Sequence, residues 1–285
     1  MSEGVQPRPL VDAEPARPVG ESSSLPRSER ARRSGYRRRF VLIYGALALI
    51  GGIAIGALVV LLGRPDAVPN PAWSSWEPTG SSDAKVKQIA DHVAKEYKLQ
   101  GAQMVVALGG PPTVTGGGAD GTSPIPISAI AVRPDTSTGQ AEESDIELVD
   151  ASKSVQFVLC GLGQGCALSK GPATESRHTL LQRQALELAL YTFKYVGGVN
   201  AVTVFLPPPP GGQSAGTAVF LEHKDIDPEL SMPLTKTLSP LTPSVGTIKA
   251  RELQMLNRIT RSRLYQFQYT QAQDLSAVLV LDPVA

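Results

Sequence analysis

The sequence predicts an α+β protein with a single N-terminal transmembrane helix. An extracytoplasmic domain follows, in which two or three helices cover a mainly antiparallel sheet. Three observations predict this arrangement. Residues 40–63 contain no charged residue, no proline and no amide side chain. Beyond residue 82, segments with helical apolar periodicity alternate with short runs typical of strands. Loops rich in Gly and Pro separate many of these runs, as is common between antiparallel strands.

Residues 1–39 are rich in Pro, Ser, Glu and Arg and show no periodic apolar face. This composition predicts a disordered cytoplasmic tail. A cluster of arginines precedes the apolar segment and sets the topology under the positive-inside rule. Its members are Arg32, Arg33, Arg37, Arg38 and Arg39. Nucleic-acid binding is the alternative reading of such a cluster, but the adjoining apolar segment already explains the charges. Residues 64–285 hold 18 basic and 21 acidic residues, and this mildly acidic balance argues against nucleic acid as a partner of the outer domain. We therefore expect membrane lipid, and no nucleic acid, as a partner.

The apolar segment 40–63 predicts an uncleaved signal anchor. Its 24 residues span about 36 Å as a helix, against a hydrocarbon core of about 30 Å. A cleaved signal peptide would have a shorter apolar region and a cleavage site with small residues, which residues 61–65 lack. Ala48, Gly52 and Gly56 recur at every fourth position, a spacing that favours close helix pairing and a homodimer. The alternative is that glycine is simply common in membrane helices.

Residues 64–81 predict a juxtamembrane linker that contains Pro and Ser. Trp73 and Trp76 stand near its end. Tryptophan is enriched at membrane interfaces, so the two rings are expected either there or packed onto the domain. The sequence leaves both alternatives open.

The extracytoplasmic domain is expected over residues 82–285. Apolar periodicity predicts helices, the first with Ser82 or Asp83 as its N-cap, at 83–97, 174–196 and 248–259. Alternating or continuous apolar runs predict strands at 103–108, 127–132, 145–149, 155–160, 201–206, 217–223, 264–269 and 277–281. We expect the strands at 145–149 and 155–160 to form a hairpin. The last strand is apolar throughout, which favours a central place in the sheet.

A helix-strand-strand order recurs in residues 83–132, 174–223 and 248–281. This recurrence is consistent with internal duplication. Coincidence is the alternative, because helix-strand-strand is a common local order.

Cys160 and Cys166 are the two cysteines of the chain, and three glycines stand between them. In an oxidising compartment such a pair predicts a structural disulfide. Two free thiols are the alternative. The C-x-x-C spacing of a redox site is absent.

Three short motifs of enzymes occur in unsuitable surroundings. Residues 212–216 match G-x-S-x-G around Ser214, but four prolines precede them and a strand follows. Residues 116–121 match G-x-G-x-x-G but lead into Pro124 and Pro126 rather than a helix. Ser82 and Lys85 match S-x-x-K without the accompanying K-T-G motif. We therefore predict no catalytic residue, no cofactor and no metal site.

The sequence thus favours a non-catalytic interaction module that binds an envelope protein or a cell-wall partner. The high content of Arg, Ala, Gly and Pro is typical of a GC-rich bacterium, so the module would face the space outside the cell membrane. One alternative is a relay that couples the outer domain to the basic tail. Another is an envelope hydrolase that uses Ser82 or Ser214.

Overall fold

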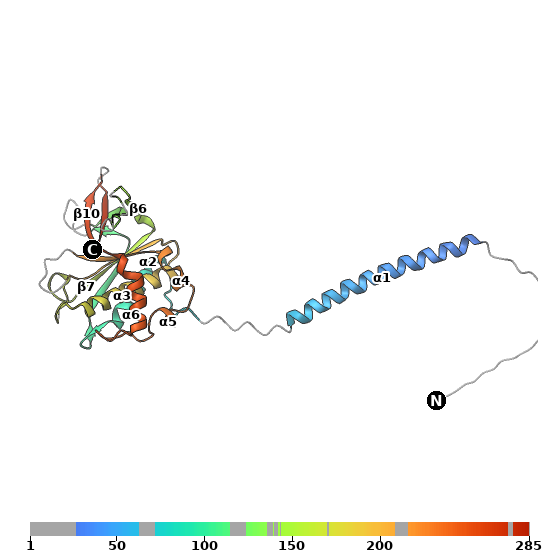
Figure 1. The fold of residues 1–285 in the computed structure, drawn as a ribbon, viewed down its shortest axis with the longest axis horizontal. Helices are drawn as coiled ribbons and strands as arrows, with labels where there is room; N and C mark the ends of the chain where they lie inside the picture. Colours follow the sequence, from blue (N-terminus) through green and yellow to red (C-terminus); the bar gives the residue numbers. More distant parts are fainter. Residues whose placement is uncertain are drawn as a thin grey trace, which may run out of the picture. The chain divides into compact units, whose positions relative to one another are not determined.

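A computed structural model describes residues 27–62, 72–114, 124–135, 139, 142, 144–169, 171–208, 216–272 and 276–284. The chain divides into two compact units, Met1–Asn70 and Pro71–Ala285. Helix α1 (Arg27–Leu62) belongs to the first unit, and every other described helix and strand belongs to the second (Figure 1).

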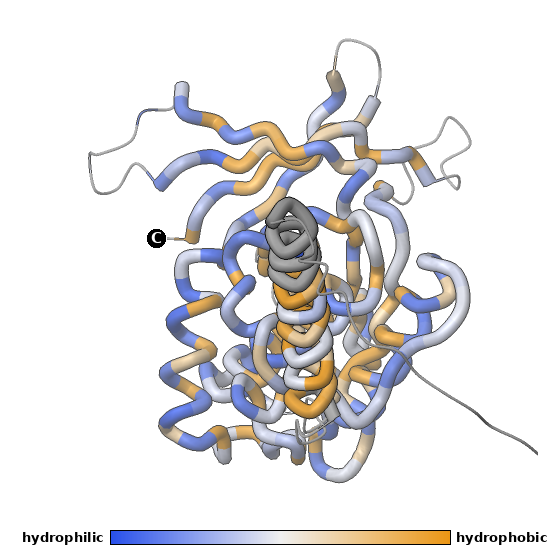
Figure 2. Tube along the Cα trace, turned by 90° about the vertical axis from the view of Figure 1, so that its right-hand side faces the viewer, coloured by the Kyte–Doolittle hydropathy of each residue, from blue (hydrophilic) through white to orange (hydrophobic). Residues whose placement is uncertain are grey.

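Helix α1 is long and apolar enough to cross a membrane over Arg39–Val60. The apolar stretch can be followed along the helix in Figure 2. The helix begins at Arg27 and therefore includes residues 27–39 of the predicted 1–39 tail. An apolar helix supplies the nucleus, and Arg, Ala and Glu have high enough helix propensity to extend it towards the N-terminus. Residues 1–26 lie outside the described part of the chain.

The three predicted helices of the domain are confirmed. They are α2 (Ser82–Glu96), α3 (Glu175–Tyr195) and α6 (Ala250–Thr260), with the short helices α4 (Asp227–Leu230) and α5 (Leu234–Thr237) between the last two. Four 3₁₀ turns accompany them: η1 (Ala151–Lys153), η2 (Gln164–Cys166), η3 (His223–Asp225) and η4 (Arg261–Arg263). The N-cap of α2 is Ser81 rather than Ser82 or Asp83, because the Ser81 hydroxyl accepts a hydrogen bond from the Ala84 amide at 3.4 Å.

The described strands are β1 (Lys98–Leu99), β2 (Ala102–Gln103), β3 (Val105–Gly110), β4 (Thr113–Val114), β5 (Ile125–Val132), β6 (Glu147–Asp150), β7 (Ser154–Gly161), β8 (Ala201–Phe205), β9 (Thr217–Glu222), β10 (Leu264–Gln271) and β11 (Ala277–Pro283). Strands β1 and β2 form a small sheet of their own, and the main sheet has the order β3-β7-β8-β9-β10-β11-β5-β4, with β6 also paired to β5. The pairs β7–β8 and β11–β5 are parallel and the other described pairs are antiparallel. The protein is therefore α+β with a mixed sheet. The predicted central place of the last strand is confirmed, because β11 lies between β10 and β5.

The sheet curls into a half-barrel, and the strands at its two ends are consecutive in the chain. Strands β3 and β4 stand at opposite ends of the strand order, yet only Pro111 and Pro112 separate them in the chain. The Gln156 side chain on β7 joins the returning strand to the sheet. Its amide oxygen accepts from the Thr113 amide at 3.3 Å, and its amide nitrogen donates to the Thr113 carbonyl at 3.1 Å. These two bonds imitate one rung of a β-ladder.

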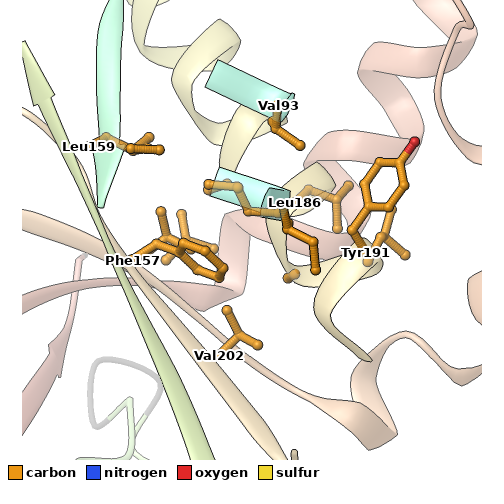
Figure 3. Close-up of a cluster of buried hydrophobic side chains, with 14 of the residues drawn as sticks. Val93, Phe157, Leu159, Leu186, Tyr191 and Val202 are labelled. Carbon is orange, nitrogen blue, oxygen red and sulfur yellow. The ribbon is translucent and has the colours of Figure 1, made fainter. Parts of the chain in front are cut away.

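Apolar side chains fill both faces of the sheet. On one face α2, α3 and α6 cover the strands (Figure 1). Figure 3 shows Leu186 and Tyr191 of α3 beside Phe157 of β7 and Val202 of β8. The opposite, concave face holds a second cluster, whose largest buried members are Ile130, Phe205, Phe220, Tyr265 and Leu279. Because the concave face is itself buried, every residue of β8 is buried, which accounts for a sequence that is apolar except at Thr203.

The predicted hairpin between residues 145–149 and 155–160 was wrong. Both strands exist, but β6 pairs with β5, whereas β7 pairs with β3 and β8. The turn η1 lies between them, with Ala151 buried and the Asp150 carboxylate accepting from the Ser152 amide at 2.9 Å. Apolar alternation marks a strand but does not select its neighbour.

The strand pairing is not the same in the three predicted helix-strand-strand units. Strands β8 and β9 are antiparallel neighbours, as are β10 and β11. Strands β3 and β5 of the first unit are not neighbours. The helix-plus-hairpin pattern is therefore found in the second and third predicted units.

The folded unit starts earlier than residue 82. Trp73 is 9% exposed and belongs to the helix-side core, and Trp76 packs against the same core. The Trp73 ring meets the edges of Tyr191 and Tyr195, while the Trp76 ring stacks on His92 with ring centroids 3.9 Å apart. Both tryptophans thus pack onto the domain, since burial removes large apolar rings from water.

Candidate ligand cleft

A cleft of about 760 Å³ opens at one end of the half-barrel. Its floor is formed where strands start or finish together: Tyr265 pairs with Pro283, and Val132 pairs with both Leu281 and Glu147. The end of α6 and the turn η4 form a wall. We call this cavity the mouth cleft. Its volume lies within the range of about 300–1,000 Å³ that is usual for ligand sites, and barrel mouths are frequent places for them.

Four arginines line the mouth cleft, and three of them pair with acids that do not line it. Arg258 binds Glu229 at 2.5 Å, Arg263 binds Asp225 at 2.5 Å, and Arg133 binds Asp282 at 2.9 Å. Arg261 is exposed and makes no ion pair with any residue that the structure describes. Its guanidinium keeps its donors available for a carboxylate or phosphate group.

Acidic side chains approach the same cleft from the beginning of β6. Glu147 accepts from the Lys224 ammonium at 3.1 Å, and Asp145 lies nearby in the lining. Hydrogen bonds to Glu222 and Glu147 raise the pKa of Lys224, so this lysine stays charged. Burial raises the pKa of Tyr265 on the floor, which therefore keeps its phenolic proton at neutral pH. Arg133, Arg258, Arg263 and Glu147 are thus paired with opposite charges, whereas Arg261 and Asp145 form no ion pair with a described residue.

A buried polar network holds the helix that forms the cleft wall. The Arg183 side chain on α3 is 1% exposed and donates to the Glu252 carboxylate of α6 at 2.7 Å. The same guanidinium donates to the Tyr97 hydroxyl at 2.5 Å and to the Ser239 carbonyl at 3.0 Å. Helix α6 then runs on to Asn257 and Arg258 at the cleft. The network therefore fixes the wall relative to α3.

The charges within this network stabilise one another. Burial alone would lower the pKa of Arg183, but Tyr97, Glu187 and Glu252 around it raise that pKa overall. Burial would raise the pKa of Glu252, but hydrogen bonds from Ser239 and the charge of Arg183 lower it overall. Both partners are consequently ionised at neutral pH.

The structure joins the predicted pair Cys160 and Cys166 in a disulfide. The bond closes a short ring at the end of β7. Gly165 adopts a φ of +60°, and a Cβ on Gly161 would lie 2.3 Å from the Ala167 carbonyl oxygen. Glycine is therefore required for this tight path.

The other predicted residues of the membrane segment all lie on α1. Ala48, Gly52 and Gly56 belong to this helix, and a Cβ added at either glycine would meet nothing within 4 Å. The five topology-setting arginines lie in its first part. Their roles in helix pairing and orientation stay predictions.

The enzyme-like motifs do not form a site in the described part of the chain. Ser82 starts α2, and the Lys85 ammonium donates to the Tyr195 carbonyl at 3.1 Å. Residues 116–121 and Ser214 lie outside the described residues. His223 pairs with Asp227 at 2.6 Å, and no group of three His, Cys, Asp or Glu side chains among the described residues could hold a metal.

Sequence reasoning missed the mouth cleft, because its walls come from segments far apart in the chain. Arg258, Arg261 and Arg263 form a short basic run directly before a strand. That run was the available signal, but only the fold places the end of β5 and the start of β6 beside it.

The chain matches no protein-family model, no curated protein and no solved structure.

Proposed function

We propose that this chain is a single-pass membrane protein whose extracytoplasmic domain binds an envelope protein or a cell-wall partner without catalysing a reaction. The helix α1 supports the anchor, since its span of 22 residues reaches about 33 Å. The disulfide supports an oxidising location for the domain.

The mouth cleft carries the binding part of the proposal. A concave site with a tyrosine and aliphatic floor and a mixed charged rim suits a ligand that presents both apolar and polar groups. Because Arg261 has no ion-pair partner among the described residues, a ligand carboxylate or phosphate would pair there without breaking an existing ion pair. The neighbouring arginines already form ion pairs: Arg258 with Glu229, Arg263 with Asp225, and Arg133 with Asp282.

Photo-cross-linking tests this assignment in native membranes. A photoreactive amino acid replaces Asn257, an exposed residue of the cleft wall, in the full chain. We expect one discrete cross-linked product, strongly reduced by Arg261→Glu. Arg251→Glu is the matched control. Arg251 lies in α6, whereas Arg261 is the C-cap of the same helix; both side chains are exposed, but Arg251 does not line the cleft. Equal yields from both variants would contradict the assignment of the cleft.

A further inference from the structure

Strand β3 forms one edge of the main sheet. It pairs with β7 on one side and with no described strand on the other. The Gln103 side-chain amide donates to the Val105 carbonyl at 2.7 Å. Apart from this bond and the pairing with β7, the backbone of residues 105–110 has no hydrogen bond to any other described residue. An edge of this kind recognises extended polypeptide specifically, because the bonds it offers are those of a β-ladder.

The side chains of β3 lack the usual protection of an edge. Residues 105–110 contain no charge and no proline. Val106 is 39% exposed and Leu108 is 60% exposed. The other face of the strand is closed, since a Cβ at Gly109 would lie 2.6 Å from Phe157 and 2.8 Å from Val86 of α2. An uncharged edge with exposed apolar side chains tends to pair with another strand.

We propose that β3 pairs antiparallel with β3 of a second copy of this chain. In the register centred on Ala107, Val106 of each copy lies opposite Leu108 of the other. Both exposed side chains of each copy then gain an apolar neighbour across the new pair. The strand carries no charge that would repel an identical strand. Antiparallel self-pairing has two-fold symmetry and is closed, so association stops at two copies.

The inference rests on the proposed function in one respect, namely that both copies are anchored on the same side of one membrane. A single short edge buries less than the roughly 1,200 Å² that stable soluble interfaces reach. Confinement of two anchored domains to one membrane surface raises their effective concentration and compensates for the small contact. The dimer is therefore expected in the bilayer, with the domains rather than α1 supplying the specific contact.

Energy transfer between labelled copies of the full chain in liposomes tests the pairing. The wild type should associate in a manner that depends on the protein-to-lipid ratio. Leu108→Lys should weaken association at least about tenfold, because it places like charges near each other across the pair. Leu241→Lys is the control, since Leu241 is 83% exposed and lies outside β3. Gly52→Leu combined with Gly56→Leu should leave association unchanged.

Disulfide trapping tests the register. Copies with Val106→Cys are mixed in the same liposomes with copies that carry Leu108→Cys. Mild oxidation should yield more mixed dimers than dimers of either variant alone, and the native cysteines are already joined to each other. A monomeric wild type at high density, an unchanged Leu108→Lys variant, or dimers lost only with the glycine variants would overturn the proposal. The sidedness of the domain is measured without any dimer, so failure of the pairing is distinguishable from failure of the proposed function.

Discussion

Replacement of Arg183 by methionine removes the cation from the buried network between α3 and α6. The Arg183 side chain is 1% exposed and that of Glu252 is 6% exposed. In the variant, the Glu252 carboxylate keeps its hydrogen bonds from the Ser239 amide and hydroxyl but loses its ion pair. The Ser239 carbonyl and the Tyr97 hydroxyl each lose a donor as well.

The expected loss is large compared with the stability of a domain. Removing one partner of a buried ion pair costs about 3–5 kcal/mol, because the remaining charge is left without compensation. A typical domain unfolds with a free energy of about 5–15 kcal/mol. We therefore expect Arg183→Met to lower the free energy of unfolding by about 3–5 kcal/mol and to disturb the cleft wall with it.

Urea unfolding followed by tryptophan fluorescence measures this effect in the full chain. Trp73 and Trp76 are the two tryptophans of the chain, and both pack in the Pro71–Ala285 unit, so the signal reports that unit. With a slope of about 2–3 kcal/mol per molar urea, the midpoint should fall by about 1–2.5 M.

The exposed Arg251 provides the control for this measurement. Arg251→Met should change the free energy of unfolding by about 0.5 kcal/mol or less. Adding Glu252→Gln to Arg183→Met should recover part of the loss, since it removes one of the two carboxylates, Glu252 and Glu187, that lose their ion pair with Arg183. Equal midpoints for Arg183→Met and Arg251→Met would refute the reasoning.

Further predictions concern the closure of the half-barrel, the disulfide and acid. Gln156→Leu removes the side-chain amide that bonds the two Thr113 backbone groups. It should lower the free energy of unfolding by about 1–3 kcal/mol in the same urea assay. A change under about 0.5 kcal/mol would contradict the ladder-like role of the Gln156 amide. Serine at both Cys160 and Cys166 should lower it by about 2 kcal/mol, and a reducing agent should have no further effect on that variant. The pKa of Glu252 lies below its ordinary value of 4.5 in the folded state, so its contribution is complete above pH 4.5 and is lost as the pH falls through the folded pKa. Urea midpoints measured across this acid range should therefore fall less in Glu252→Gln than in the wild type.

The sequence predicts elements well where one chemical pattern decides them. Helix α3 has a broad apolar face, the Thr174 hydroxyl as its N-cap and two glycines after its end. Strand β8 is apolar in sequence because both of its faces are buried. These signals are local, so they can be recognised without the fold.

Pairing and cleft formation are not local. The alternation of β6 and β7 marks two strands, but the turn at Ala151 sends them to different neighbours. The contribution of Trp73 to the core is also hidden in the sequence, because this residue stands in a segment rich in Pro and Ser. The mouth cleft depends on strand ends that only the curl of the sheet brings beside η4.

Thiol labelling of intact cells tests the anchored, outward-facing domain most directly. The chain has one cysteine pair, so the labelling reports one site. A membrane-impermeant maleimide polymer should not react with intact cells, but should add two labels after brief treatment with an impermeant reductant. Labelling that requires lysis, and that needs no reductant, would place two free thiols inside the cell and contradict the account.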